Sequence, residues 1–440
     1  MSSRTVPQSQ EPLQGAAYLR LILLGALIGI PAALVAAGFL AFVHLLEEWL
    51  WDDLPSALGS SSPPWYLVIG LPVVGALVVV AARTLLPGDG GHSPLAGIGG
   101  GVTPLAYAPG VALAAIGTLA FGAVLGPEAP LIALGSVVGM AVTPVVKLSE
   151  RETQVIATAG SFSAISALFG GPLVAGVLLL ESGVGLGAAV IPALLPGLVS
   201  AAVGYLVFVG LGDWGGLSTT TLSVSGLPAY DGTRLWDLLI AVGIGLVAAV
   251  LVFAVKRIAT AVDGLHRRRI GLAGLLVGGG LVVGLLAQLV ELLGADSQEV
   301  LFSGQTGIPE LIREGSTSVL LTLLAAKALG YAICLGCGFR GGPVFPAIFL
   351  GVGLGALAVV WFDVSPTLAV AVGAAAGMAS TTRLLFSSLL LAALLTGREG
   401  LDAMPAAVLA ACTAWVVTMA LGRRTAAREA GAQRGDQAAH

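Results

Sequence analysis

The residue of this sequence that most plainly suggests chemistry is Glu128, a carboxylate inside the apolar stretch LGPEAPLIALG. A carboxylate at membrane depth is costly and is functional by default. In the functional interpretation, Glu128 competes with a permeant anion for backbone N–H groups and releases them when it is protonated. It would thereby gate the path or couple it to protons. The alternative is a glutamate that only complements a helix dipole, worth about 0.3–1 kcal/mol. Because a dipole role needs no burial, we favour the gate.

The stretch around Glu128 recurs in the second half of the chain. Residues 126–142 read GPEAPLIALGSVVGMAV, and residues 342–358, offset by 216, read GPVFPAIFLGVGLGALA. Matches at an offset of 217 continue into the next apolar stretch. The coincident pairs are Gly126/Gly342, Pro127/Pro343, Pro130/Pro346, Ile132/Ile348, Leu134/Leu350, Gly135/Gly351, Gly139/Gly355, Gly160/Gly377, Ser163/Ser380, Leu168/Leu385 and Phe169/Phe386. The repeat predicts two related halves with a substrate path at their interface.

The repeated motif, Gly-Pro-x-x-Pro before an apolar run, predicts the start of a helix, because proline is tolerated in a first turn. The first N–H groups of a helix lack partners within it. Inside a membrane they need an anion or a carboxylate. Both halves are therefore expected to direct a positive helix end at one interior point, and the preferred ligand of that point is an anion.

Five further side chains invite competing interpretations. Glu181, in GVLLLESG, is a candidate inner proton relay or a helix-end residue bonded to backbone. Arg340 precedes the second helix start by two residues and is a candidate pore-mouth cation or an interfacial side chain. Lys327 and Arg383 are single cations in apolar stretches, which either pair with carboxylates or helix ends or raise the potential along an anion path. His92 either titrates near neutral pH or is an exposed loop residue.

The composition fixes the setting in which these residues act. Of 440 residues, 57% are hydrophobic and 10% are charged, and the mean hydropathy is +0.98. A soluble domain carries about 25% charged residues, so a soluble enzyme, a nucleic-acid binder and a secreted disulfide scaffold are excluded. The 63 glycines, within apolar stretches, indicate close helix packing and broken helices. The three cysteines read as packing residues, and we expect neither metal nor cofactor.

The apolar stretches predict an all-α polytopic membrane protein with many tilted and half-length helices. Several are shorter than the ~20 residues needed to span a bilayer. They fall near 21–43, 65–82, 102–125, 131–146, 154–180, 185–211, 236–255, 269–293, 317–337, 344–362, 366–382, 384–397 and 403–421.

We expect a cytoplasmic tail over 1–16, a first repeat over 17–268, a second repeat over 269–422 and a short cytoplasmic tail over 423–440. Arginines before the first helix and after the last one place both termini in the cytoplasm. The arginine cluster at 267–269 pulls the other way if its loop is external.

These stretches resemble the CLC family of chloride channels and chloride/proton antiporters. The pore motifs of that family are Gly-Ser-Gly-Ile-Pro, Gly-Arg-Glu-Gly-Pro and Gly-x-Phe-x-Pro. GGHSP at 90–94 is similar to the first, GPEAP at 126–130 to the second, and GGPVFP at 341–346 to the third. LGPE and GFRGG resemble especially a divergent bacterial branch of ion-transport proteins. The resemblance covers roughly residues 20–420.

The resemblance implies an inverted repeat, a homodimer with one pore in each subunit, and Glu128 as the gating glutamate. It implies that the anion is bound near three helix starts, by Gly91, His92, Ser93, Gly126, Pro127, Ala129, Gly342, Pro343, Val344 and Phe345.

Three departures from the family pattern bear on transport. Gly91 stands in the place of an anion-contacting serine. The inner proton glutamate falls on Ser182 when the helix is aligned on Pro172, which leaves Glu181 one place earlier. The pore tyrosine near the C-terminus has no counterpart, since the last tyrosine is Tyr331.

The sequence therefore predicts a multi-pass protein of the cell membrane that conducts small anions, first of all chloride. A passive channel and a proton-coupled exchanger are both open, and so are fluoride and nitrate as substrates. An intramembrane enzyme is a remote alternative, because no HExxH or GxSxG motif stands in the apolar stretches. A scaffold that has lost conduction is another.

Overall fold

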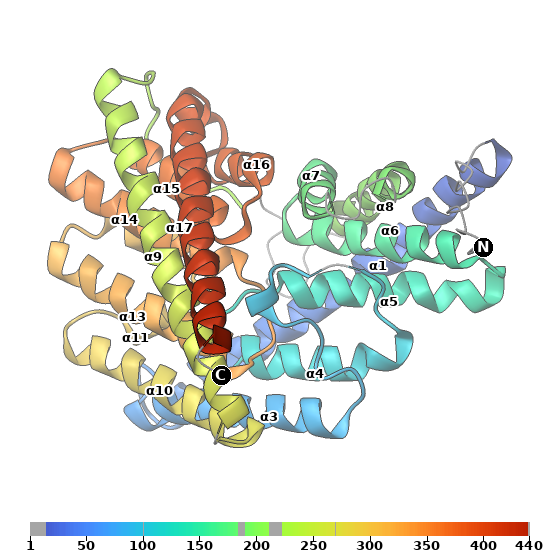
Figure 1. The fold of residues 1–440 in the computed structure, drawn as a ribbon, viewed down its shortest axis with the longest axis horizontal. Coiled ribbons are helices and arrows are strands. Elements are labelled where there is room, and N and C mark those ends of the chain that lie inside the picture. The colour runs from blue at the N-terminus through green and yellow to red at the C-terminus, as the bar shows by residue number, and fades with distance from the viewer. Residues whose placement is uncertain (1–14, 100, 184–189, 211–221, 269, 439–440) are drawn as a thin grey trace.

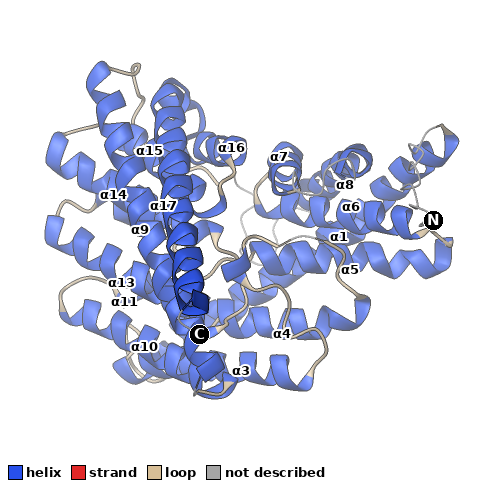
Figure 2. Cartoon of the chain, in the orientation of Figure 1, coloured by secondary structure: helices blue, strands red, loops and turns tan. Residues whose placement is uncertain are grey.

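The computed structural model describes residues 15–99, 101–183, 190–210, 222–268 and 270–438. Helices dominate these residues, and the β pairing among them is a single isolated bridge (Figure 2). Within the described ranges, nine helical segments are long and apolar enough to cross a membrane, and two shorter apolar helices accompany them. The all-α, multi-pass architecture expected from the sequence is confirmed.

The first eight helices precede the gap at residues 211–221. They are α1 (Ala16–Glu48), continued by a π-helical turn at Trp49–Asp53 and by α2 (Leu54–Ala57), then α3 (Trp65–Leu85), α4 (Ala108–Leu119), α5 (Glu128–Val146), α6 (Glu150–Leu168), α7 (Pro172–Ser182) and α8 (Val190–Gly210).

The remaining helices follow that gap. They are α9 (Leu235–Arg268), α10 (Leu272–Leu292), α11 (Ser297–Val300), α12 (Ile308–Arg313), α13 (Thr317–Cys337), α14 (Val344–Phe362), α15 (Pro366–Thr382), α16 (Leu385–Thr396) and α17 (Met404–Ala438). In Figure 1, α5–α8 lie on one side and α13–α17 on the other, and α7 packs against α16 where the sides meet.

The two sets of helices repeat each other in length and in packing. The 33 residues of α1 compare with 34 in α9, the 21 of α3 with 21 in α10, and the 19 of α5 with 19 in α14. The pairs α5–α6, α6–α8 and α1–α8 pack together, as do α14–α15, α15–α17 and α9–α17. We propose from this pairing that the second repeat begins at α9, earlier than the expected boundary at 268/269.

Glycines hold the central helix pair of each half in close contact. A Cβ at Gly160 would lie 2.1 Å from the carbonyl oxygen of Gly135, so α5 and α6 touch through bare backbone. In α14 and α15, a Cβ at Gly377 would lie 2.1 Å from the carbonyl oxygen of Ala347, and one at Gly351 would lie 2.0 Å from that of Gly373. The matched glycines of the repeat thus allow the same close contact between two helices in both halves.

Some expected helices have different bounds in the structure. The stretch 154–180 is two helices, because Gly170 takes φ +69 and Pro172 starts a new first turn. The stretch 102–125 contains only a 3₁₀ turn at Leu105–Tyr107 and the short α4, which is followed by a turn at Gly122 with φ +86. The polar segment from 257 continues α9 to Arg268, and the residues after Leu421 continue α17 to Ala438. Residues 1–14 of the expected N-terminal tail lie outside the described residues.

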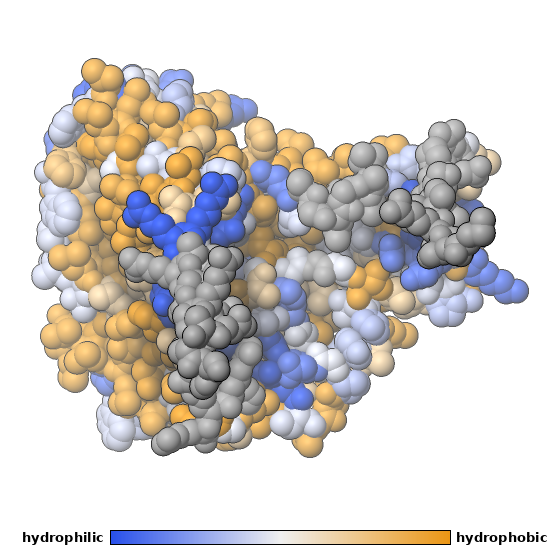
Figure 3. All heavy atoms as spheres, in the orientation of Figure 1, coloured by the Kyte–Doolittle hydropathy of each residue, from blue (hydrophilic) through white to orange (hydrophobic). Residues whose placement is uncertain are grey.

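The surface agrees with a membrane setting. In Figure 3, apolar residues cover the left part of the visible face, over α9 and α13, whereas hydrophilic residues gather toward the middle and the right. Large side chains such as Leu239, Leu246 and Val250 of α9 are 59%, 47% and 50% exposed, which suits lipid better than water.

Candidate functional site: a carboxylate at two opposed helix starts

The two predicted helix starts meet in the interior. Helix α5 begins at Glu128 after the N-cap Pro127, and α14 begins at Val344 after the N-cap Pro343. Just before them, the Gly126 N–H donates to the Gly342 carbonyl oxygen at 2.8 Å, and the Gly342 N–H donates back to Gly126 at 2.5 Å. The expectation that both halves present a helix start at a shared interior point is confirmed.

The Glu128 carboxylate lies between the start of its own helix and the start of α14. The side chain is completely buried, and its Oε1 accepts a hydrogen bond from the Phe345 N–H at 3.0 Å. Its Oε2 has no hydrogen-bond partner. The carboxylate therefore takes the place that unpaired N–H groups of α14 offer to an anion.

Bare backbone makes room for this carboxylate. A Cβ on Gly342 would lie 1.5 Å from Glu128 Oε2, and a Cβ on Gly126 would lie 2.4 Å from it. These two glycines form what we call the glycine cradle. Any side chain at Gly342 would collide with the carboxylate, so the glycines serve an oxygen-binding space as well as close packing.

The other predicted residues at these two starts surround the cradle through backbone and apolar groups. Ala129 is 6% exposed, Val344 is fully buried, and Phe345 is 1% exposed. The ring of Phe345 packs against Phe169 with 5.6 Å between ring centroids. Pro127 and Pro343 are the two N-cap residues.

The third predicted helix start, at Gly91–Pro94, is wrong. The chain forms only a 3₁₀ turn at Pro94–Ala96, without a side-chain cap. Gly91 takes φ +97 and its N–H donates to the Gly88 carbonyl oxygen at 2.9 Å, so that donor is already used. Repeated positive φ values at the neighbouring glycines prevent a helix here. The Ser93 side chain makes no capping hydrogen bond, and the His92 side chain is exposed.

Arg340 is committed to an ion-pair network. Its side chain is 5% exposed and pairs with the carboxylate of Asp89, while its Nε donates to the Asp89 carbonyl oxygen at 3.0 Å. Arg83 holds the same carboxylate at 2.8 and 3.0 Å and also donates to the Gly338 carbonyl oxygen at 2.8 Å. Burial, and then the charge of Arg83, lowers the pKa of Arg340 to about 10, so it stays charged at neutral pH. The network ties the loop after α3 to the segment before α14.

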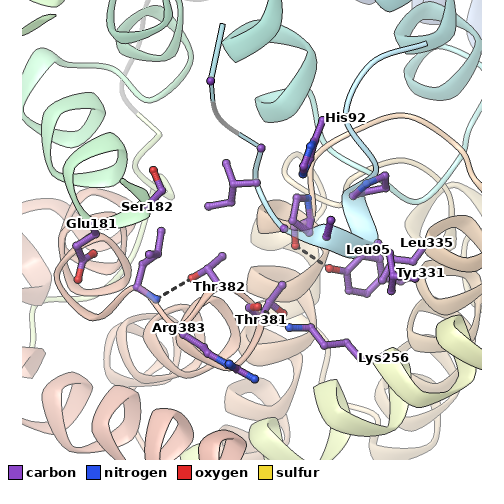
Figure 4. A pocket seen from close by; sticks show the side chains of 18 residues that line it. His92, Leu95, Glu181, Ser182, Lys256, Tyr331, Leu335, Thr381, Thr382 and Arg383 are labelled. Carbon is purple, nitrogen blue, oxygen red and sulfur yellow. Dashed lines mark hydrogen bonds between the residues drawn. The ribbon is translucent and has the colours of Figure 1, made fainter. Parts of the chain in front are cut away.

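A cavity of about 810 Å³ opens beside the cradle, bounded by the segment around His92 and by α7, α9, α13 and the end of α15 (Figure 4). Its polar lining is made by His92, Glu181, Ser182, Lys256, Tyr331, Thr381, Thr382 and Arg383. The Tyr331 hydroxyl donates to the Pro343 carbonyl oxygen at 2.9 Å, which places it between this cavity and the start of α14. A second cavity, of about 260 Å³, includes Gly91, His92 and Ala129.

Glu181 caps a helix across the interface. Its Oε1 accepts from the Phe386 N–H at 3.0 Å, and its Oε2 accepts from the Ser387 N–H at 2.8 Å and the Ser387 hydroxyl at 2.6 Å. These donors belong to the start of α16. The geometry matches the interpretation of a residue bonded to backbone, and the inner-relay role stays a prediction.

The comparisons with known proteins bear on this geometry. The family model described as voltage gated chloride channel, the CLC family, matches residues 91–419. The chain belongs to the CLC family. "Putative ion-transport protein YfeO" of Salmonella schwarzengrund is 30% identical over 349 residues, which cover 75% of this chain and 78% of that protein. The protein of the same name from Escherichia coli O1:K1 is 28% identical over 352 residues, or 74% and 76% of the two chains.

Solved structures agree with the CLC fold. A slow cyanobacterial Cl⁻/H⁺ antiporter superposes with a TM-score of 0.73 and 17% identity, over 92% of this chain and 95% of that one. A CLC-type fluoride/proton antiporter has a TM-score of 0.70 and 21% identity, over 92% and 96% of the two chains.

Lys327, one of the two isolated cations, supports this CLC fold at a helix end. Its Nζ donates to the carbonyl oxygens of Glu299 and Leu301, at 2.9 and 2.6 Å, at the end of α11. It also lies 4.6 Å from the centroid of the Phe349 ring. The expectation that it meets a helix C-terminus is confirmed.

Sequence reasoning missed three residues that the CLC fold brings to the cavity or to its supporting loops. Lys256 stands directly after the expected apolar stretch 236–255 and was assigned no role. Thr381 lies in MASTTRLLF without a motif of its own. Asp89 follows Gly88, takes φ +50 and is bonded to two arginines. The doublet Lys256-Arg257 directly after a long apolar stretch is the signal that could have indicated the first.

Proposed function

We propose that this protein transports small inorganic anions across the cell membrane, chloride first among them, with Glu128 as the gate. The observation that carries the proposal is the Glu128 carboxylate in the glycine cradle, bonded to the Phe345 N–H through one oxygen and unbonded at the other. A carboxylate in that place mimics a bound anion, so a diffusible anion and Glu128 compete for one position.

The gate follows from the charge of this carboxylate. When Glu128 is ionised, its Oε1 holds the Phe345 N–H, because hydrogen bonds to charged acceptors are roughly twice as strong as neutral ones. Protonation removes the charge and weakens that bond. The side chain can then leave the cradle, and the backbone between Gly342 and Phe345 is free to bind the incoming anion. Flux should therefore rise as the pH falls.

Anion/proton exchange is the second candidate, because the gate is itself a titratable group. Two solved structures of this fold are a Cl⁻/H⁺ antiporter and a CLC-type fluoride/proton antiporter. In this version each anion that displaces Glu128 exposes it to a proton, and Glu181 at the cavity wall is the candidate inner relay. Its three hydrogen bonds would have to break before it could carry a proton.

The setting of the proposal is a homodimer in the lipid bilayer, with one pore in each subunit and both termini in the cytoplasm. Arg20 near the start of α1 and Arg423 and Arg424 in α17 support that orientation by the positive-inside rule. Protease or label accessibility of both termini in oriented vesicles, and the mass of the purified protein by light scattering, test these two points.

The function is tested by anion efflux from vesicles that contain the purified protein, with chloride, fluoride and nitrate in turn. We expect efflux of at least one of these anions that increases toward acid pH. The variant Glu128→Gln should conduct with a flat pH profile, whereas Glu291→Gln, at the exposed end of α10, should behave as wild type. Absence of flux for every anion, or an unchanged profile in Glu128→Gln, would contradict the proposal.

A further inference from the structure

One wall of the large cavity gathers donors from two helices beside Tyr331 (Figure 4). Lys256, on α9, donates from its Nζ to the Thr381 carbonyl oxygen at 2.6 Å. Thr381 is the second-last residue of α15, and it lines the same cavity. This hydrogen bond joins the two helices and brings the lysine Nζ to the residue whose side chain lines the cavity.

Some hydrogen-bond donors at this wall of the cavity have no acceptor in the structure. A lysine ammonium has three N–H donors, and the bond to Thr381 O occupies one of them. Thr381 is only 8% exposed, and its hydroxyl lies near that of Tyr331 without a hydrogen bond of good geometry. A buried hydroxyl without a partner costs about 1–3 kcal/mol. Tyr331 differs, because its hydroxyl is already committed to Pro343.

The charge at this wall is also unbalanced. Arg383 is close enough for its charge to act on Lys256. Within the part of the chain that the structure describes, neither cation forms an ion pair with a carboxylate. The carboxylate that lines the same cavity, Glu181, is bonded to the start of α16. Lys256 is partly buried and Arg383 is exposed, and two neighbouring like charges favour a counter-ion.

We propose that this wall is an anion-binding site, at which a small monovalent anion binds to Lys256 Nζ and the Thr381 hydroxyl before it reaches Glu128. The inference rests on the proposed function, since it assigns a waiting site to the same permeant ion. It supplies a hydroxyl donor and a fixed cation on a path where Gly91 provides no side chain. Tyr331 and Pro343 lie between this site and the cradle.

A purely structural role for Lys256 explains part of the geometry. The Thr381 carbonyl oxygen belongs to the last turn of α15, and a cation stabilises a helix C-terminus. That role uses the bond already seen and needs nothing from the Thr381 hydroxyl. The two roles therefore separate in an experiment that measures anion binding as well as stability.

The test uses the purified full-length protein with bromide and chloride as probes. Bromide should give an anomalous diffraction peak within hydrogen-bonding distance of Lys256 Nζ and Thr381 Oγ. Lys256→Met and Thr381→Val should each weaken chloride binding measured by calorimetry, the lysine variant by about tenfold or more. Lys256→Arg and Thr381→Ser should retain it, and Lys147→Met, an exposed cation after α5, is the matched control.

The outcomes separate this site from the gate. Wild-type affinity in Lys256→Met and Thr381→Val, together with normal Glu128-dependent flux, would overturn the inner site alone. Absence of anion flux and binding in the wild type would overturn the proposed function and the site together. If Lys256→Met does not fold, unchanged chloride affinity in Thr381→Val and a bromide peak absent from this wall decide against the site.

Discussion

Two carboxylates of the first half, Glu128 and Glu181, each reach across the interface to the start of a helix in the second half. Glu181 binds α16 through three hydrogen bonds that use both oxygens. Glu128 binds α14 through one, and its other oxygen is left unbonded against the glycine cradle. Both oxygens of the Glu181 carboxylate thus accept hydrogen bonds, whereas only one oxygen of the Glu128 carboxylate does.

The difference separates a fixed cap from a movable gate. Removing Glu181 would leave two backbone donors and a hydroxyl without their partner, and each such bond to a charged group contributes about 1.5–3 kcal/mol. Displacing Glu128 breaks one bond and also relieves a buried oxygen that has no partner. An anion can therefore replace the Glu128 carboxylate much more easily than the Glu181 carboxylate.

The largest effect should come from breaking the saturated cap. Glu181→Ala is expected to lower the free energy of unfolding by about 3 kcal/mol, because the start of α16 loses three hydrogen bonds and water replaces part of them at this partly exposed position. Glu128→Gln should change it by less than about 1 kcal/mol. Thermal unfolding of both variants in the same detergent measures the contrast. Equal losses in the two variants would show that the caps do not differ.

A smaller effect should follow from filling the cradle. In Gly342→Ala the new methyl group takes the position of Glu128 Oε2, so carboxylate and anion are both displaced. We expect anion flux to fall about tenfold and stability to drop by about 1–3 kcal/mol, the usual cost of overpacking. Gly38→Ala is the control, because a Cβ there meets nothing within 4 Å. Normal flux in Gly342→Ala would mean that the anion does not pass through the cradle.

The smallest effect should come from His92, which lines both cavities. Partial burial, and then the charge of Arg340, lowers the pKa of His92, so the ring gains its charge at a lower pH than an ordinary histidine. A positive ring then attracts anions, and His92→Gln should reduce flux about twofold at pH 5 and leave it unchanged at pH 7.5. A reduction of the same size at both pH values would assign His92 a role other than titration.

The sequence predicts the contacts that local chemistry determines and misses those that join distant segments. Pro127 and Pro343 predict the two helix starts, and the matched glycines predict close helix packing. Both predictions succeed because proline and glycine act on the backbone at their own positions. The glycine run around Gly91 looks like a third start, yet its positive φ values form turns instead.

The partner of Glu181 at Ser387 is 206 residues away, and that of Arg340 at Asp89 is 251 residues away. No local pattern specifies either pair. Lys256 and Thr381 were missed for the same reason, since their bond spans 125 residues and appears only when α9 packs against α15.

The most direct test of the account compares the pH dependence of anion efflux in wild type, Glu128→Gln and Glu181→Gln, all reconstituted in the same vesicles. Gln keeps the size of the side chain and removes its titration. The account predicts a flat profile for Glu128→Gln and an acid-activated profile, like that of wild type, for Glu181→Gln. An acid-activated profile in Glu128→Gln, or a profile abolished only in Glu181→Gln, would contradict it.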